Sequence, residues 1–328
     1  MKKILMISSF IINPLILLPF SAQVNIKDYP HTEISNRLVK MKLYLPNTEN
    51  GYYRGTRFEW SGVIPSLKYK GHQYFGEWKS THDPFFHEDL SGPVEGAITA
   101  GLGYDEAETG GRFIRIGVGV LEKPDEKEYQ WNHTYKILDY GRWTIDSGKD
   151  WIEFKHELNS EIGWGYIYIK KIELKKNEPG FTITHILKNT GAKQIETDQF
   201  NHNFFVMDGQ LTGPDFTVSF PFALKTENDL KDLMKIENNE LLFTRELTEG
   251  SIWLLLEGYG TDVRDHEVIV RNHKTGAGVQ FKVDKPISRL AFWATTTTLC
   301  PENFISISVA PGNEEKWISD YTLFIIKK

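Results

Sequence analysis

Apolar and polar residues alternate with a period of two along much of the chain beyond residue 110. This alternation, in runs rich in β-branched and aromatic residues, predicts half-buried β-strands. The runs are FIRIGVGV (113–120), YIYIKKIEL (166–174), FTITHIL (181–187), DFTVSF (215–220), GVQFKV (278–283), RLAFWA (289–294) and ISISV (305–309). Turn-forming sequences such as NEPG (177–180) and NTGAK (189–193) separate them. The pattern therefore predicts an all-β protein of antiparallel strands, as a sandwich or barrel.

One segment departs from this alternation. Residues 224–240 are polar and charged, and Leu230, Leu233 and Met234 recur at helical spacing. That spacing predicts a short surface helix on a connecting loop. There is no fixed-period repeat and no linker that divides the chain. We therefore expect residues 23–328 to form a single β-sandwich domain.

The N-terminus has the pattern of a targeting segment. Lys2 and Lys3 precede an apolar run over residues 4–20, and the small residues Ser21 and Ala22 follow it. Two prolines interrupt the run, which favours a cleaved signal over a membrane-spanning helix. We expect residues 1–22 to be a signal peptide and the protein to be periplasmic or secreted, with no membrane anchor after cleavage.

Composition narrows the function classes. The chain is 40% hydrophobic and 25% charged, which is typical of a globular protein with a sizeable core. Its formal net charge is -6 and it has no basic stripe, which argues against a nucleic-acid partner. Cys300 is the only cysteine, so an internal disulfide and a cysteine-based zinc site are both excluded.

Four segments are unusually dense in polar and aromatic residues: 51–78, 82–96, 197–209 and 295–317. Sugar recognition uses aromatic faces for the C–H groups and directed donors and acceptors for the hydroxyls. In the third segment, TDQFNHNFFVMDG, a histidine lies between two asparagines. Because imidazole is the natural proton carrier near neutral pH, His202 is a candidate acid or base. The expected ligand is a monosaccharide or small saccharide.

The order RGTRFEWSG, GPVEGA, NHNFFVMDG and CPENFISISVAPGNEEKW resembles the aldose 1-epimerase (galactose mutarotase-like) superfamily over residues 51–317. The resemblance implies a large antiparallel β-supersandwich that interconverts sugar anomers without a cofactor. NHNFF is similar to a family segment whose histidine is the general acid, and CPE to one whose glutamate is the general base. His202 would then be the acid and Glu302 the base, with His202 protonated and Glu302 ionised at the start.

The resemblance also implies substrate-binding residues. Arg57, with Arg54 nearby, occupies the place of the family's sugar-binding arginine, and His87 the place of a second histidine. We expect Asn203, beside His202, to contact the sugar as well. Export suggests an unusual or acidic sugar, which local arginines would have to recognise. The chain lacks the Leu-His-Gly segment that carries the second histidine in the best-known members.

Other functions remain open. A non-catalytic carbohydrate-binding protein of the same fold would keep the arginines and aromatics but would not need Glu302. A glycan lyase or hydrolase accessory would need a second acid or a tyrosine base and a long cleft.

The residues His82, Asp83, His87, Glu88 and Asp89 also form a run of potential metal ligands. Their spacing fits no helical metal motif, so we interpret the run as a polar loop at the edge of the pocket. Calcium on its oxygen ligands stays open, and no metal site is predicted.

Overall fold

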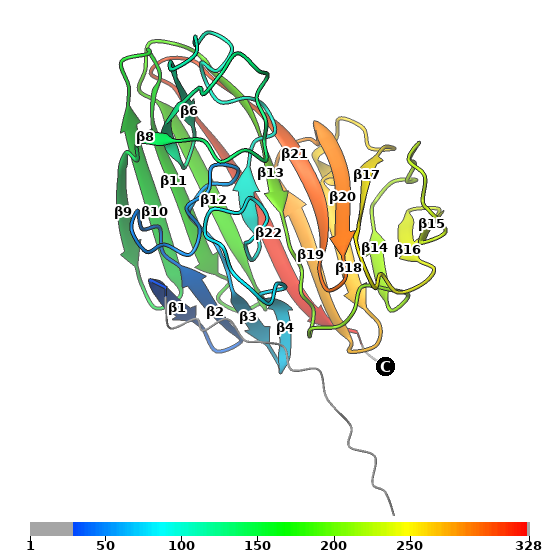
Figure 1. The fold of residues 1–328 in the computed structure, drawn as a ribbon. Helices are drawn as coiled ribbons and strands as arrows, with labels where there is room; N and C mark the ends of the chain where they lie inside the picture. Colours follow the sequence, from blue (N-terminus) through cyan, green and yellow to red (C-terminus); the bar gives the residue numbers. More distant parts are fainter. Residues whose placement is uncertain (1–28, 327–328) are drawn as a thin grey trace, which may run out of the picture.

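The computed structural model describes residues 29–326, whose regular secondary structure is almost entirely β-strand (Figure 1). The strands make four antiparallel sheets, so the prediction of an all-β antiparallel fold is confirmed. The one short helix among these residues is the 3-10 turn η2, Val263–Asp265.

The largest sheet has ten strands in the order β15-β16-β14-β18-β19-β22-β12-β11-β10-β9. In chain order they are β9 (Arg142–Ser147), β10 (Trp151–Asn159), β11 (Gly165–Leu174), β12 (Gly180–Asn189), β14 (Phe216–Ser219), β15 (Met234–Glu237), β16 (Glu240–Phe243), β18 (Glu267–Asn272), β19 (Ala277–Val283) and β22 (Glu314–Ile325). Along β10, β11 and β12 every second residue is buried, so one face of this sheet carries the core.

Three smaller sheets complete the fold. A five-stranded sheet has the order β17-β20-β21-β13-β5, and the others have the orders β1-β2-β3-β4 and β6-β7-β8. Their strands are β1 (His31–Ser35), β2 (Val39–Tyr44), β3 (Ser66–Tyr69), β4 (His72–Phe75), β5 (Val94–Gly96), β6 (Arg112–Arg115), β7 (Gly119–Glu122), β8 (Ile137–Asp139), β13 (Ile195–His202), β17 (Ser251–Leu256), β20 (Arg289–Thr295) and β21 (Leu299–Val309).

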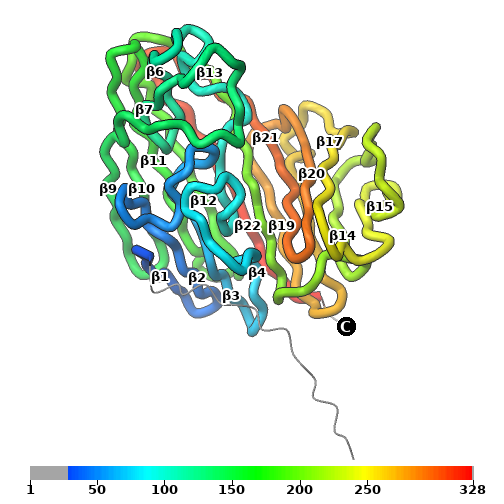
Figure 2. The backbone as a smooth tube through the Cα atoms, in the orientation of Figure 1, coloured from blue at the N-terminus to red at the C-terminus, as the bar shows by residue number. Residues whose placement is uncertain are grey.

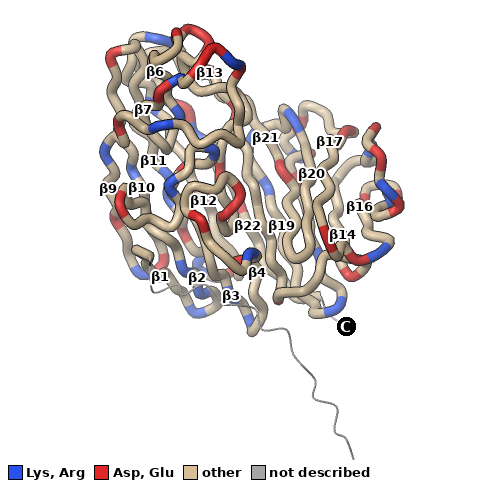
Figure 3. The backbone as a smooth tube through the Cα atoms, viewed as in Figure 1, with Lys and Arg blue, Asp and Glu red and all other residues tan. Residues whose placement is uncertain are grey.

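The five-stranded sheet lies against the buried face of the ten-stranded sheet (Figures 1 and 2). Apolar side chains from both sheets form one continuous core, and strands β1–β4 close one end of it. The connections around β6–β8 lie at the other end. Acidic and basic residues are mixed over the molecule in this view, and no extended basic stripe is visible (Figure 3).

Two local predictions are wrong. Residues 224–240 contain no helix: Lys231 and Asp232 both have positive φ, and Leu233 and Met234 are buried in the core, where Met234 begins β15. The run 113–120 is not one strand but the end of β6, a turn and the start of β7. Gly117 turns the chain there with φ of 75°, and a Cβ at this position would lie 2.4 Å from the Cβ of Glu59.

The predicted signal peptide falls on residues that lie outside the described part of the chain. Within residues 29–326 there is no helix long and apolar enough to cross a membrane.

Candidate active site

A cavity of about 400 Å³ lies over the face of the five-stranded sheet that is turned away from the ten-stranded sheet. Its floor consists of side chains two or four residues apart on four neighbouring strands: Phe200 and His202 of β13, Glu302 and Phe304 of β21, Arg289 and Trp293 of β20, and Ser251 and Trp253 of β17. The period-two alternation of strands brings these residues to one face. The connections provide the other wall, namely Arg57, Glu88, Ala97, Ile98 and Trp131. The volume is in the range of about 300–1,000 Å³ that is usual for small-molecule sites.

His202 and Glu302 lie directly opposite each other across the β13–β21 pair. Their side chains meet, with His202 Nε2 3.1 Å from Glu302 Oε1. Both are buried, with exposed fractions of 3% and 5%. The imidazole stacks on Phe204 at 3.9 Å between ring centroids. The two residues that the resemblance selected therefore face one cavity as a contacting pair.

Burial sets the protonation of this pair. It raises the pKa of Glu302 to about 7, against the lowering effect of Arg57 and Arg289. Burial also lowers the pKa of His202 well below its ordinary value, and the charge of Arg57 adds to this effect. In the free site the imidazole is neutral near pH 7, and a proton held by the pair is on Glu302. Both shifts oppose the expected starting state, with His202 protonated and Glu302 ionised, because desolvation disfavours both charged forms.

Two arginines and several large rings surround the pair. The Arg57 guanidinium lies 4.2 Å from the Trp131 ring centroid and 4.6 Å from that of Phe58. Arg289 lies at the start of β20, with its guanidinium 5.5 Å from the Phe304 ring centroid. Trp131 and Trp253 are 40% and 45% exposed and so form the rim of the cavity. Rings and cations in this arrangement are suited to a polar ligand with apolar C–H faces.

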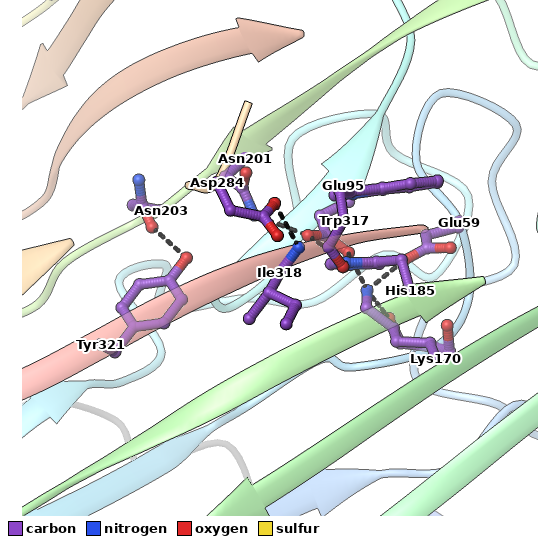
Figure 4. A network of polar contacts seen from close by, with 11 residues as sticks. Glu59, Glu95, Lys170, His185, Asn201, Asn203, Asp284, Trp317, Ile318 and Tyr321 are labelled. Atoms are coloured by element: carbon purple, nitrogen blue, oxygen red, sulfur yellow. Dashed lines mark hydrogen bonds and ion pairs between the residues drawn. The ribbon is translucent and has the colours of Figure 1, made fainter. Parts of the chain in front are cut away.

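The opposite face of β13 is anchored in a network of polar contacts, shown in Figure 4. Asn201 donates from Nδ2 to Glu95 Oε1 at 2.6 Å, and Asn203 accepts at Oδ1 from the Tyr321 hydroxyl at 2.8 Å. Asn203 also donates to the Pro301 carbonyl at 2.8 Å. The two asparagines thus hold both sides of His202 against the ten-stranded sheet and against β21. This explains why asparagines flank the histidine in the sequence.

The centre of the network is a buried charge cluster. The Lys170 ammonium contacts the carboxylates of Glu59 and Glu95, and His185 Nε2 lies 2.9 Å from Glu95 Oε2. Burial raises the pKa of Glu59 to about 8. Burial would also raise the pKa of Glu95, but His185 and Lys170 more than offset it, so this pKa is lowered. Gly62 makes room for the lysine, since a Cβ there would lie 2.9 Å from Lys170 Nζ.

Three predicted substrate-binding residues do not line the cavity. Asn203 is fully buried in the contacts just described. Arg54 donates to the Glu49 carbonyl at 2.8 Å and lies over the Phe85 ring. His87 lies 3.6 Å from Glu88 and 5.3 Å, between ring centroids, from Trp131, so it adjoins two cavity residues without being one. Arg57 alone of the predicted substrate-binding residues lines the cavity together with His202 and Glu302.

Sequence reasoning missed Arg289, Trp293, Trp253, Trp131 and Glu88. A signal for two of them was present, because Arg289 and Trp293 are four apart in the predicted strand RLAFWA and so share a face. Choosing that face required the pairing of β20 with β21, in which Ala291 lies opposite Glu302.

Within the run of potential metal ligands, His82 contacts other protein groups through both of its ring nitrogens. His82 Nδ1 lies 3.0 Å from Asp89 Oδ1, and its Nε2 lies 2.7 Å from the Tyr52 carbonyl oxygen. Within residues 29–326 no three histidine, cysteine, aspartate or glutamate side chains are grouped as a metal site would require.

Several solved structures share this fold. The Slr1438 protein from Synechocystis sp. PCC 6803 superposes with a TM-score of 0.58 at 11% identity, covering 94% of this chain and 99% of its own. A putative aldose 1-epimerase from Escherichia coli K12 gives 0.54 at 13% identity, covering 90% and 100%. A GalM/aldose epimerase homologue from C. elegans gives 0.56 at 12% identity, covering 90% and 99%. The chain therefore has the galactose mutarotase-like fold. No protein-family model and no curated protein matches the sequence.

Proposed function

We propose that this protein interconverts the anomers of a sugar by acid–base ring opening at His202 and Glu302. The observation that carries the proposal is the 3.1 Å contact between these two side chains on one wall of a cavity of about 400 Å³. Aromatic rings and arginines around the pair suit a monosaccharide. The fold supports the proposal only in general terms, because chemistry belongs to the site rather than to the scaffold.

The reaction needs one acid and one base. Glu302 takes the proton of the anomeric hydroxyl while His202 gives a proton to the ring oxygen. The bond from C1 to the ring oxygen breaks and C1 becomes an aldehyde carbonyl. After rotation about C1–C2 the same steps run in reverse on the other face, which restores both groups. Such proton transfers contribute about 10²–10⁴-fold.

The pair must therefore hold one proton. In the free site that proton is on Glu302, whose pKa is about 7. Moving it to His202 Nε2 across the 3.1 Å contact gives the state in which Glu302 is the base and His202 the acid. If the proton stays on Glu302, the same reaction runs with His202 as the first base. In both cases the pair, rather than either residue alone, is the working unit.

Anomer exchange measured by NMR saturation transfer tests the proposal. Wild-type protein should accelerate exchange for at least one sugar in a panel of neutral and acidic monosaccharides. His202→Asn and Glu302→Gln should each abolish that acceleration while the protein stays folded. Absence of acceleration on every sugar would refute the proposal.

A second candidate is a carbohydrate-binding protein without turnover. The half-exposed Trp131 and Trp253 at the rim favour it, because exposed aromatic platforms are typical of sugar-binding surfaces. The same NMR experiment separates the two, since a binding protein broadens the sugar signals without transferring saturation between anomers.

We also propose that the protein acts outside the cytoplasm, on the basis of the charged and apolar pattern of its first 22 residues. N-terminal sequencing of the protein from its native cell should show removal of this segment. An intact Met1 in the mature protein would contradict export.

A further inference from the structure

Two of the buried or partly buried arginines within residues 29–326 differ from the others in having no hydrogen-bond partner for the guanidinium group. Of the arginines that are not fully exposed, three use their guanidinium in hydrogen bonds: Arg54 with a backbone carbonyl, Arg115 with three backbone carbonyls and Arg271 with the Ser219 hydroxyl. In the same part of the chain, the guanidinium groups of Arg57 and Arg289 have no hydrogen-bond partner. Their buried Arg57 Nη1 and Arg289 Nε atoms are left unpaired. Both arginines line the same cavity.

The cavity's own carboxylates do not neutralise these two cations by contact. Glu302 pairs with His202, and Glu88 lies 3.6 Å from His87 Nε2. Among residues 29–326 no carboxylate oxygen lies within 4.0 Å of the Arg57 or Arg289 guanidinium. Buried donors without partners are costly, and such groups in a cavity indicate where a ligand supplies the missing acceptors.

The aromatic surroundings hold both guanidinium groups in place. Arg57 is on the connection between β2 and β3 and lies over Trp131, while Arg289 is on β20 near Phe304 and Trp253, at 5.5 Å and 5.9 Å from their ring centroids. Stacking on rings leaves the edge of a guanidinium free to donate, and that edge matches planar or tetrahedral oxyanions. Arg289 lies on the floor of the cavity and Arg57 on the wall formed by the connections, so one ligand between them is able to contact both.

Building on the proposed function, we propose that the sugar bound here carries an anionic substituent, a carboxylate or a sulfate ester, that is recognised by Arg289 together with Arg57. Arg289 is then the residue that selects substrates, because it has no other partner and lies on the floor beside Phe304 and Trp293. A neutral hydroxyl accepts one hydrogen bond from an arginine, but it leaves the charge of the second arginine unopposed.

Dissociation constants measured by calorimetry test the inference. The probes are D-galacturonate, D-galactose 6-sulfate and D-galactose, each titrated into wild-type protein. At least one anionic sugar should bind about tenfold or more tightly than galactose, as expected for charge-assisted bonds. Preference for galacturonate identifies the carboxylate, and preference for the sulfated sugar identifies the sulfate ester. Equal affinity for all three sugars would overturn the inference.

The variant Arg289→Gln isolates the role of this arginine. It should reduce affinity for the preferred anionic sugar about tenfold or more, and by a clearly larger factor than affinity for galactose, so that the preference is lost. Arg271→Gln removes a comparable half-buried arginine on β18 and should leave the preference intact. A preference that survives Arg289→Gln in a folded protein would overturn the assignment of Arg289. Thermal unfolding of both variants establishes that they are folded.

Binding and exchange are measured separately, so the two proposals fail separately. Preference for an anionic sugar without accelerated exchange supports the inference and refutes the isomerase. Accelerated exchange on neutral sugars, with no preference for anionic ones, supports the isomerase and refutes the inference of an anionic sugar.

Discussion

At the end of strand β13, Asn201 and Asn203 on one side of the chain and His202 on the other use their buried polar atoms in opposite ways. On the inner face, Asn201 and Asn203 have all their contacts within the protein, in a network with Glu95 and Tyr321 (Figure 4). On the outer face, His202 meets Glu302 but leaves Nδ1 without a partner among the described residues. Because unpaired buried polar groups are costly, proteins retain them where a ligand or a reaction needs them. Asn201 and Asn203 are therefore structural, and His202 on the outer face carries the candidate chemistry.

This contrast predicts opposite responses to mutation. Removing a charge from the inner network breaks pairs that folding has already satisfied. Removing a charge from the outer site should instead raise stability, because the folded protein does not fully offset the cost of desolvating that charge.

The largest expected effect is at the centre of the inner network. Lys170→Met removes the ammonium that contacts Glu59 and Glu95, so buried Glu59 loses its cation and buried Glu95 keeps only His185 and Asn201. The free energy of unfolding in urea at pH 8 should fall by about 3–5 kcal/mol. Lys171→Met, its neighbour on the outer face of β11, contacts Glu173 near solvent and should change stability by less than about 0.5 kcal/mol. Equal effects of the two substitutions would contradict the structural role of the network.

Glu302→Gln should stabilise the protein at high pH. The folded-state pKa of Glu302 is about 7 against an ordinary 4.5, so the folded protein holds this proton more tightly than the unfolded chain. Wild-type stability therefore falls as pH rises from 4.5 to 7, by up to about 3 kcal/mol, and stays lower above pH 7. Glutamine does not titrate, so urea unfolding should show the gain at pH 8 and not at pH 4.5. A loss of stability at pH 8 would mean that the protein compensates the charge of the Glu302 carboxylate, as it does for Glu95 in the inner network.

Exchange by the wild-type protein should fall as pH rises above 7, because the pair then loses its one proton. The decline should approach about tenfold per pH unit well above the pKa. Saturation transfer from pH 6 to 9, with protein-free exchange subtracted at each pH, gives the profile. A protein-dependent rate that is flat or rising to pH 9 would show that the pair does not act through a single proton.

The smallest effect is expected at Arg54. Its guanidinium binds the Glu49 carbonyl and lies over Phe85, outside the cavity, so Arg54→Gln should change the exchange rate less than about twofold. Arg57→Gln, which removes a cation from the cavity wall, should cost about tenfold or more. Steady-state exchange at several sugar concentrations compares the two. Equal losses of exchange rate in Arg54→Gln and Arg57→Gln would contradict the placement of Arg57 in the site and of Arg54 outside it.

The sequence predicted the part of this contrast that depends on local alternation. Period two is enough to place His202 and Phe200 on one face of a strand and Asn201 on the other. It does not say which face is covered by a second sheet, and so Asn203 was expected to touch the sugar. Arg289 was missed for the same reason, since only the pairing of β20 with β21 brings it beside Glu302 and Phe304. The expected helix near Leu233 was wrong because burial of Leu233 and Met234 in the core overrides a helical spacing of three leucine-like residues.

A double-mutant cycle on anomer exchange tests the central claim most directly. His202→Asn, Glu302→Gln and the combined variant are compared with wild-type protein on the sugar that it converts fastest. If the two side chains work as one proton-carrying pair, each single variant loses about 10²–10⁴-fold and the double variant loses no more than the worse single. Losses that multiply in the double variant, or single variants that exchange as fast as wild type, would contradict the account.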